Sequence, residues 1–135
     1  MTIPNLLLRF LLVYVGLMVL AWAILVLLRF ENFVGLDAAM LFGAITIVST
    51  QFAKNNGRYF SNEEKTKVIL GMLSIDLVLQ FLLSILPAML PGRQIPPPGK
   101  LLFMLALVGG LHFLAISLFV TLERRFLIKK GLIEG

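Results

Sequence analysis

The chain has 135 residues, of which 59% are hydrophobic and only 14% are charged, and its mean hydropathy is +0.98. An average soluble domain is about 45–50% apolar and about 25% charged. So short a domain exposes much of its surface and cannot hide this excess of apolar side chains in a core. The composition therefore excludes a free-standing water-soluble domain, and the absence of cysteine excludes thiol catalysis and cysteine-bound metal centres.

Four apolar stretches are long enough to cross a bilayer, which takes roughly 17–25 residues. They cover residues 10–28, 33–53, 68–86 and 101–122, and the first two are separated by a short turn at residues 29–32. At about 1.5 Å per residue, each stretch is about 28–33 Å long, enough for the hydrocarbon core. We therefore predict an all-α, polytopic membrane protein, a single membrane domain with four transmembrane helices in a bundle.

The connections between these stretches carry local stop and start signals. Residues 54–67 form the one substantial polar loop, in which Asn55-Asn56-Gly57 predicts a helix end. Ser61 and Glu64 then predict a capping box, so the third helix is expected to begin before the membrane. The loop at residues 87–100 holds five of the six prolines and cannot be helical throughout.

Lysine and arginine residues are divided unequally between the two ends of such a bundle. Nine of the 12 fall on the side shared by the N-terminus, the loop 54–67 and the tail 123–135, and three fall on the other side. Short loops rich in these residues face the cytoplasm, so we expect both termini to be cytoplasmic and the loop 87–100 to be periplasmic. The nine are Arg9, Lys54, Arg58, Lys65, Lys67, Arg124, Arg125, Lys129 and Lys130; the three are Arg29, Arg93 and Lys100.

The C-terminal tail alternates basic pairs with an apolar triplet. Its cations Arg124, Arg125, Lys129 and Lys130 are expected to contact anionic lipid headgroups, while residues 126–128 dip into the interface. The pattern is typical of a stop-transfer anchor, and a specific lipid or protein site is the alternative. Because the positive charge suits a membrane surface, no nucleic acid partner is expected.

Polar side chains are few inside the four stretches and fall at similar depths. Counted from the cytoplasmic ends, Thr46 lies at roughly 10 Å, Asp76 at roughly 12 Å and His112 at roughly 15 Å. Gln80 lies four residues after Asp76, on the same helix face. An ionisable group in hydrocarbon costs on the order of 2.5–3.5 kcal/mol by insertion scales, so these residues are expected to form an intramembrane polar layer.

Two interpretations of this layer are open. In the structural one, Asp76, His112, Thr46 and Gln80 satisfy one another and fix the register of the helices. In the functional one, they relay a proton or cation. A relay needs a polar path to both surfaces, and the outward halves of these helices offer little beyond Ser84. The structural interpretation is therefore favoured.

Small residues at a spacing of four predict close approach between helices. The pairs are Ala39 with Gly43 in the second stretch and Ala106 with Gly110 in the fourth. We expect these positions to pack against neighbouring helices.

The sequence motifs of soluble enzymes are absent. The chain contains no dinucleotide-binding glycine motif, no Walker A motif, no nucleophile elbow and no zinc-protease motif. A single histidine and scattered carboxylates do not make a metal site. We therefore expect no catalytic residues, no metal and no cofactor.

The polar loop with Tyr59-Phe-Ser-Asn-Glu-Glu-Lys65, the aspartate at position 76 and the short basic tail together show a resemblance. Over essentially its whole length, the chain resembles an uncharacterised family of small four-helix inner-membrane proteins of Gram-negative bacteria. The resemblance implies this topology and a bacterial inner membrane. It implies no mechanism, because the family has no established activity.

Two hypotheses of function follow from these patterns. The leading one is a non-enzymatic inner-membrane protein that acts through helix contacts in the bilayer, as an accessory or immunity-type protective protein. Its partners are the lipid bilayer and either another membrane protein or a second copy of the chain. The alternative is a small proton- or cation-linked transporter or channel subunit.

Overall fold

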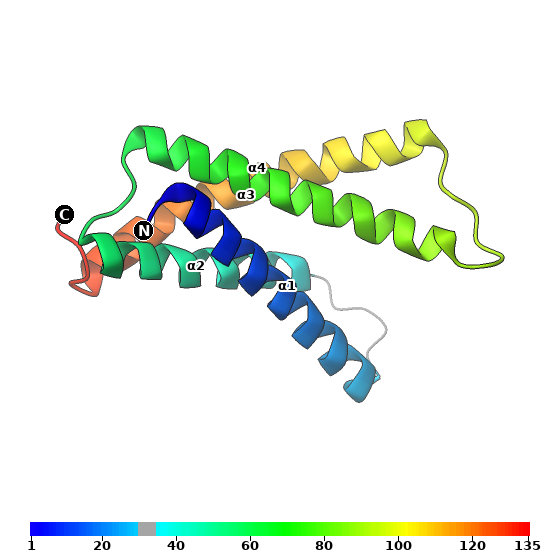
Figure 1. Cartoon of the computed structure of the whole chain (residues 1–135), viewed down its shortest axis with the longest axis horizontal. Helices are drawn as coiled ribbons and strands as arrows, with labels where there is room; N and C mark the ends of the chain where they lie inside the picture. Colours follow the sequence, from blue (N-terminus) through cyan, green and yellow to red (C-terminus); the bar gives the residue numbers. More distant parts are fainter. Residues whose placement is uncertain (30–34) are drawn as a thin grey trace.

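The computed structural model describes residues 1–29 and 35–135, which form four long helices and one short 3₁₀ turn (Figure 1). The helical content confirms the all-α class. All four long helices are long and apolar enough to cross a membrane, so their length and composition are compatible with a multi-pass membrane protein. The predicted turn beyond Arg29 and the first residues of the second stretch lie outside the described residues. The elements are α1 (Ile3–Leu28), α2 (Leu36–Asn56), α3 (Asn62–Ile85), η1 (Leu86–Met89) and α4 (Pro98–Lys129).

The ends of α2 and α3 follow the local signals in the sequence. Helix α2 ends at Asn56, and Gly57 takes a left-handed conformation with φ +65° and donates its N–H to the Ala53 carbonyl over 2.8 Å. Glycine adopts this conformation without a Cβ clash. Ser61 and Glu64 form the predicted capping box at the start of α3. These two predictions are confirmed.

Helix α4 is longer than the apolar stretch it contains. It begins at Pro98, where the missing N–H of proline belongs to the first turn and has no intrahelical partner to lose. It then continues to Lys129, so residues 123–129 of the expected tail are helical. The proline-rich connection is shortened accordingly, because residues 98–100 belong to α4.

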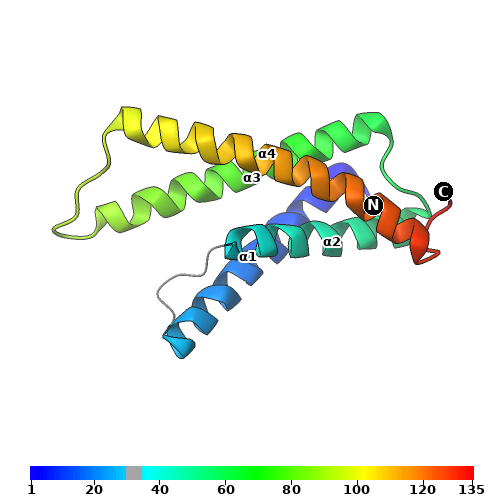
Figure 2. The same cartoon turned by 180° about the vertical axis from the view of Figure 1, so that it is seen from behind.

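The helices pack in a ring in which each has two neighbours. Helix α1 contacts α2 and α3, and α4 contacts α2 and α3. Both termini and the α2–α3 loop lie at one end of the molecule, which we call the terminal end (Figures 1 and 2). The α3–α4 connection lies at the opposite end, which we call the hairpin end.

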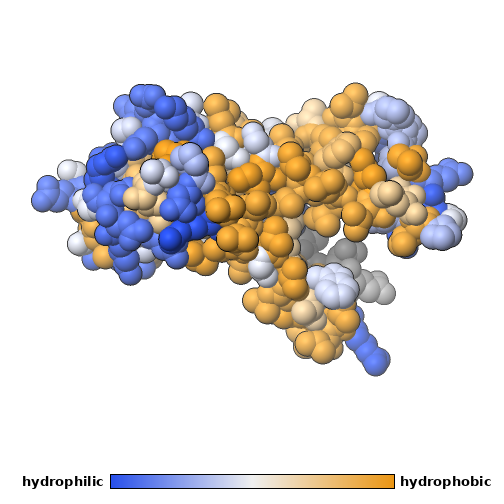
Figure 3. Space-filling model, viewed as in Figure 1, coloured by the Kyte–Doolittle hydropathy of each residue, from blue (hydrophilic) through white to orange (hydrophobic). Residues whose placement is uncertain are grey.

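Buried side chains are concentrated toward the terminal end. The last buried residue of α1 is Tyr14 and that of α3 is Asp76, while the first buried residue of α4 is Gly109. Toward the hairpin end the same helices expose large apolar side chains, including Trp22 at 68% and Leu27 at 80%. Figure 3 shows the outcome: a broad apolar band between polar ends, with α1 and the α3–α4 pair as separate lobes.

Close packing in the terminal half occurs at glycines. A Cβ atom added at Gly71 of α3 would lie 2.5 Å from a methyl carbon of Leu7 on α1, so these helices meet there. At Gly109 of α4, the nearest atom would be a methyl carbon of Leu77 at 3.0 Å. A Cβ at Gly110 would meet nothing within 4 Å. The expectation that Gly110 packs closely is therefore wrong: the face of α4 that meets α3 is that of Gly109.

Candidate functional site

The carboxylate of Asp76 is the centre of a buried polar network built from three helices. Asp76 is fully buried on α3. The hydroxyl of Tyr14, on α1, donates to its Oδ1 atom over 2.8 Å. The Nδ1 atom of His112, on α4, lies 2.5 Å from its Oδ2 atom. Both carboxylate oxygens are thus satisfied, as a polar group buried among apolar helices requires.

This network lies at the level where the helices part. Tyr14 and Asp76 are the last buried residues of their helices before the hairpin half begins. The side chain of His112 keeps 15% of its surface exposed, whereas that of Asp76 keeps none. The network therefore lies at the boundary of the packed half of the molecule, and its member His112 is partly exposed.

The predicted polar layer is assembled only in part. Asp76 and His112 meet as expected, but Thr46 donates its hydroxyl to Glu123 instead, over 3.2 Å. The reason is the order of the ring: α2, which carries Thr46, packs on α1 and α4 and does not contact α3. Gln80 makes no side-chain hydrogen bond to any described residue, and its carbonyl accepts from Ser84 over 2.7 Å. The prediction that Thr46 and Gln80 join Asp76 is wrong.

Glu123 forms a second polar cluster. The sequence does not predict this cluster, because residue 123 follows the fourth apolar stretch and was expected to belong to the tail. The side chain lies on α4 and Glu123 is only 2% exposed. Its carboxylate accepts from Thr46 at 3.2 Å and from Thr50 at 3.3 Å, which lie one turn apart on α2. The spacing of these two threonines was the available signal, since residues four apart share a helix face. The cluster ties α2 to α4.

The α2–α3 loop is fastened to α4 by a buried tyrosine. Tyr59 is 8% exposed, and its hydroxyl donates to the Val120 carbonyl over 2.6 Å. Burial raises the pKa of Tyr59 above its usual range, because the charged phenolate is disfavoured away from water. The hydroxyl therefore stays a donor at all physiological pH values, and the loop keeps its place against α4.

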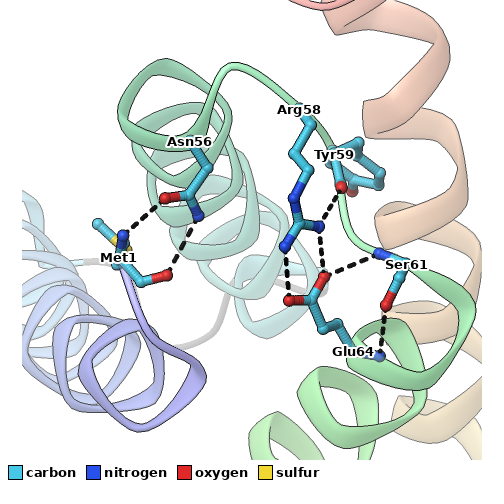
Figure 4. Close-up of polar contacts among 6 residues, drawn as sticks. All are labelled: Met1, Asn56, Arg58, Tyr59, Ser61 and Glu64. Atoms are coloured by element: carbon cyan, nitrogen blue, oxygen red, sulfur yellow. Dashed lines mark hydrogen bonds and ion pairs between the residues drawn. The ribbon is translucent and has the colours of Figure 1, made fainter.

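Polar contacts also fix both ends of this loop (Figure 4). The Arg58 guanidinium donates to both carboxylate oxygens of Glu64, at 2.6 and 2.9 Å, and this hydrogen bonding raises the pKa of Arg58. The N-terminal ammonium of Met1 donates to the side-chain oxygen of Asn56 over 2.7 Å. The amide nitrogen of Asn56 donates back to the Met1 carbonyl over 3.1 Å. The start of α1 is thereby held against the end of α2.

The four cations expected at lipid headgroups occupy different surroundings. Arg124 and Arg125 line a cavity beside the α2–α3 loop, and Arg125 also lines a groove with Lys129 between α2 and α4. The ammonium of Lys130 lies 4.2 Å from the centre of the Phe126 ring, within cation–π range. These residues are therefore not one uniform patch.

The chemistry available at the Asp76 network is the exchange or retention of a proton. A carboxylate, an imidazole and a phenol in hydrogen-bond contact can share protons, and residues 1–29 and 35–135 hold no cluster of three metal-ligating side chains. Comparisons with protein-family models, with curated proteins and with solved structures found no match to this chain. These comparisons therefore assign no function to the chain.

A double-mutant cycle tests whether Asp76 and His112 act as a pair. His112→Leu strands the Asp76 carboxylate and is expected to lower the free energy of unfolding by about 3 kcal/mol. Asp76→Leu leaves an imidazole that can become neutral, so it is expected to cost less. The double variant should cost less than the sum of the two, as measured by unfolding in detergent micelles.

The matched control for this cycle is Gln80→Leu. Gln80 lies on the same face of α3 as Asp76, and its side chain has no hydrogen-bond partner among the described residues. It is expected to change the unfolding free energy little. Strict additivity of the two leucine substitutions would contradict a direct interaction between Asp76 and His112.

Proposed function

We propose that this chain is a small, non-enzymatic protein of a bacterial inner membrane with both termini in the cytoplasm. It acts through helix contacts within the bilayer, as an accessory or immunity-type protective protein that binds another membrane protein. The observation that carries the proposal is the contrast between a tied terminal half and an open hairpin half.

The terminal half is held by directional contacts. The Asp76 network joins α1, α3 and α4, and the Glu123 cluster joins α2 and α4. In lipid, helices are held by packing and by hydrogen bonds between them rather than by exclusion of water. These contacts therefore leave the terminal half little freedom to rearrange around a partner.

The hairpin half offers surface for a partner helix. Near Trp22, α1 borders an apolar cavity of about 400 Å³ together with the start of α2 and Leu83 of α3. Among the described residues that line this cavity, Asp37 is the one with an ionisable side chain. Ala21 leaves room for close approach, as small residues do where helices pack in membranes. A transmembrane helix with a polar group at the depth of Asp37 fits this surface.

Fusions to reporter proteins test the proposed orientation. Nine of the 12 lysine and arginine residues lie on the side of the terminal end, and this excess favours the cytoplasm. Reporters placed after Gly57 and after Gly135 are expected to be active in the cytoplasm, and one at Arg93 in the periplasm. A cytoplasmic reporter at Arg93 would contradict the four-span orientation.

The second candidate function is a small proton- or cation-linked transporter subunit. It is favoured by the chain of hydrogen bonds from Tyr14 through Asp76 to the partly exposed His112. Against it, the polar residues of α3 beyond Asp76 are Gln80 and Ser84, and the Ser84 hydroxyl is already bonded to its own helix. A continuous polar route toward the hairpin end is therefore not provided by α3.

Asp76→Asn separates the two functions. The amide keeps the volume and can still accept from Tyr14, and His112 can change tautomer to pair with it, but asparagine does not ionise. We expect the variant to fold with near-normal thermal stability and to keep partner binding or protection. Reconstituted vesicles carrying the natural chain and the variant should show the same background proton flux.

Loss of a proton-driven flux in correctly folded Asp76→Asn protein would contradict this expectation and establish the transporter function. Gln80→Leu serves as the control in the same vesicles, since its side chain has no partner among the described residues. A flux that both variants lose would point to damaged packing rather than to titration of Asp76.

A further inference from the structure

A cavity of about 650 Å³ lies at the terminal end, between the α2–α3 loop and the last turns of α4. Residues far apart in the sequence form its walls: the loop from Gly57, the start of α3, and α4 from Val120. The cationic side chains among them come from all three parts, with one carboxylate from the C-terminal segment. These lining residues are Arg58, Lys65, Arg124 and Arg125, and the carboxylate is Glu134.

The cavity is held in shape by hydrogen bonds across it. The Tyr59 hydroxyl donates to the Val120 carbonyl over 2.6 Å and fixes the loop to α4. The Lys65 ammonium donates to the Thr121 hydroxyl over 2.7 Å and joins α3 to α4. A ligand that enters therefore does not have to assemble the site, which reduces the entropic cost of binding.

The charge of the cavity is positive because only some of its cations are compensated. Arg58 is paired with Glu64 at 2.6 Å, so its charge is largely neutralised. Lys65 contacts a neutral hydroxyl, and Arg124 and Arg125 form no ion pair with any described residue. Three cations thus remain against the single carboxylate of Glu134. The site favours a compact anion.

The level of the cavity in the molecule indicates where that anion comes from. Lys65 lies three residues before the apolar stretch of α3 begins at residue 68, and Arg124 lies two residues after that of α4 ends at residue 122. Phosphate groups of lipids occupy this boundary between hydrocarbon and water. Basic pockets between transmembrane helices at this boundary bind lipid headgroups, and arginine matches phosphate with two parallel N–H donors.

We propose that this cavity is a discrete binding site for the phosphate group of an anionic lipid headgroup, held by Arg124, Arg125 and Lys65. The site is distinct from diffuse attraction of the basic tail, since Lys129 and Lys130 do not line it. It does not depend on which face of the membrane the terminal end occupies, nor on the proposed helix partner.

Native mass spectrometry of the full-length chain in detergent tests the proposal by counting bound lipids. We expect the chain to bind one molecule of phosphatidylglycerol at least tenfold more tightly than it binds phosphatidylcholine. The double variant with Arg124→Gln and Arg125→Gln should lose this preference, and Lys65→Gln should weaken the preference several-fold. The matched control is Lys129→Gln with Lys130→Gln, which removes the same charge outside the cavity and should leave the preference intact.

Three results would overturn the proposal. Equal loss in the two double variants would show that binding follows overall charge. Equal affinity for the two lipids, which both carry a charged phosphate, would show that the net negative charge of the headgroup is not selected. Binding of glycerol 3-phosphate as tight as that of phosphatidylglycerol, and lost in the Arg124 and Arg125 variant, would assign the site to a soluble phosphate instead. Circular dichroism of each variant verifies that the helices are formed.

Discussion

The buried carboxylate of Asp76 is the constraint on which the arrangement of helices depends. It lies in an apolar helix, where an unpaired charge is costly, and it needs donors that α3 itself does not provide. Tyr14 and His112 supply them from α1 and α4, so both helices must pass close to α3 at the same depth. With α1 and α4 on either side of α3, α2 completes the ring opposite.

The same logic explains why the two halves of the molecule differ. Directional polar contacts, at Asp76 and at Glu123, all lie in the packed half, where they add to the close approach of α1 to α3 at Gly71. Beyond Asp76 the helices carry apolar side chains that lipid solvates as readily as another helix does. The hairpin half is therefore the part of the chain to which we assign the proposed partner, and the proposed anionic-headgroup site lies at the terminal end.

Much of the fold was predictable because it follows from local rules. Hydropathy and length predict the four helices, and Gly57 and Ser61 predict where α2 ends and where α3 begins. The pairing of Asp76 with His112 followed from their similar depth. The ring order of the helices is set by long-range packing, so the partner of Thr46 was predicted wrongly and Tyr14 was not recognised as a donor. Glu123 was missed because α4 continues past its apolar stretch.

Paired cysteines test most directly whether the chain is tied at one end and open at the other, since the natural chain contains no cysteine. Leu7→Cys with Gly71→Cys places thiols where α1 and α3 touch. Leu27→Cys with Leu86→Cys places them on exposed positions in the hairpin half. In lipid vesicles, rapid disulfide formation is expected for the first pair and none for the second. Cross-linking of the second pair as fast as the first would contradict the open hairpin half.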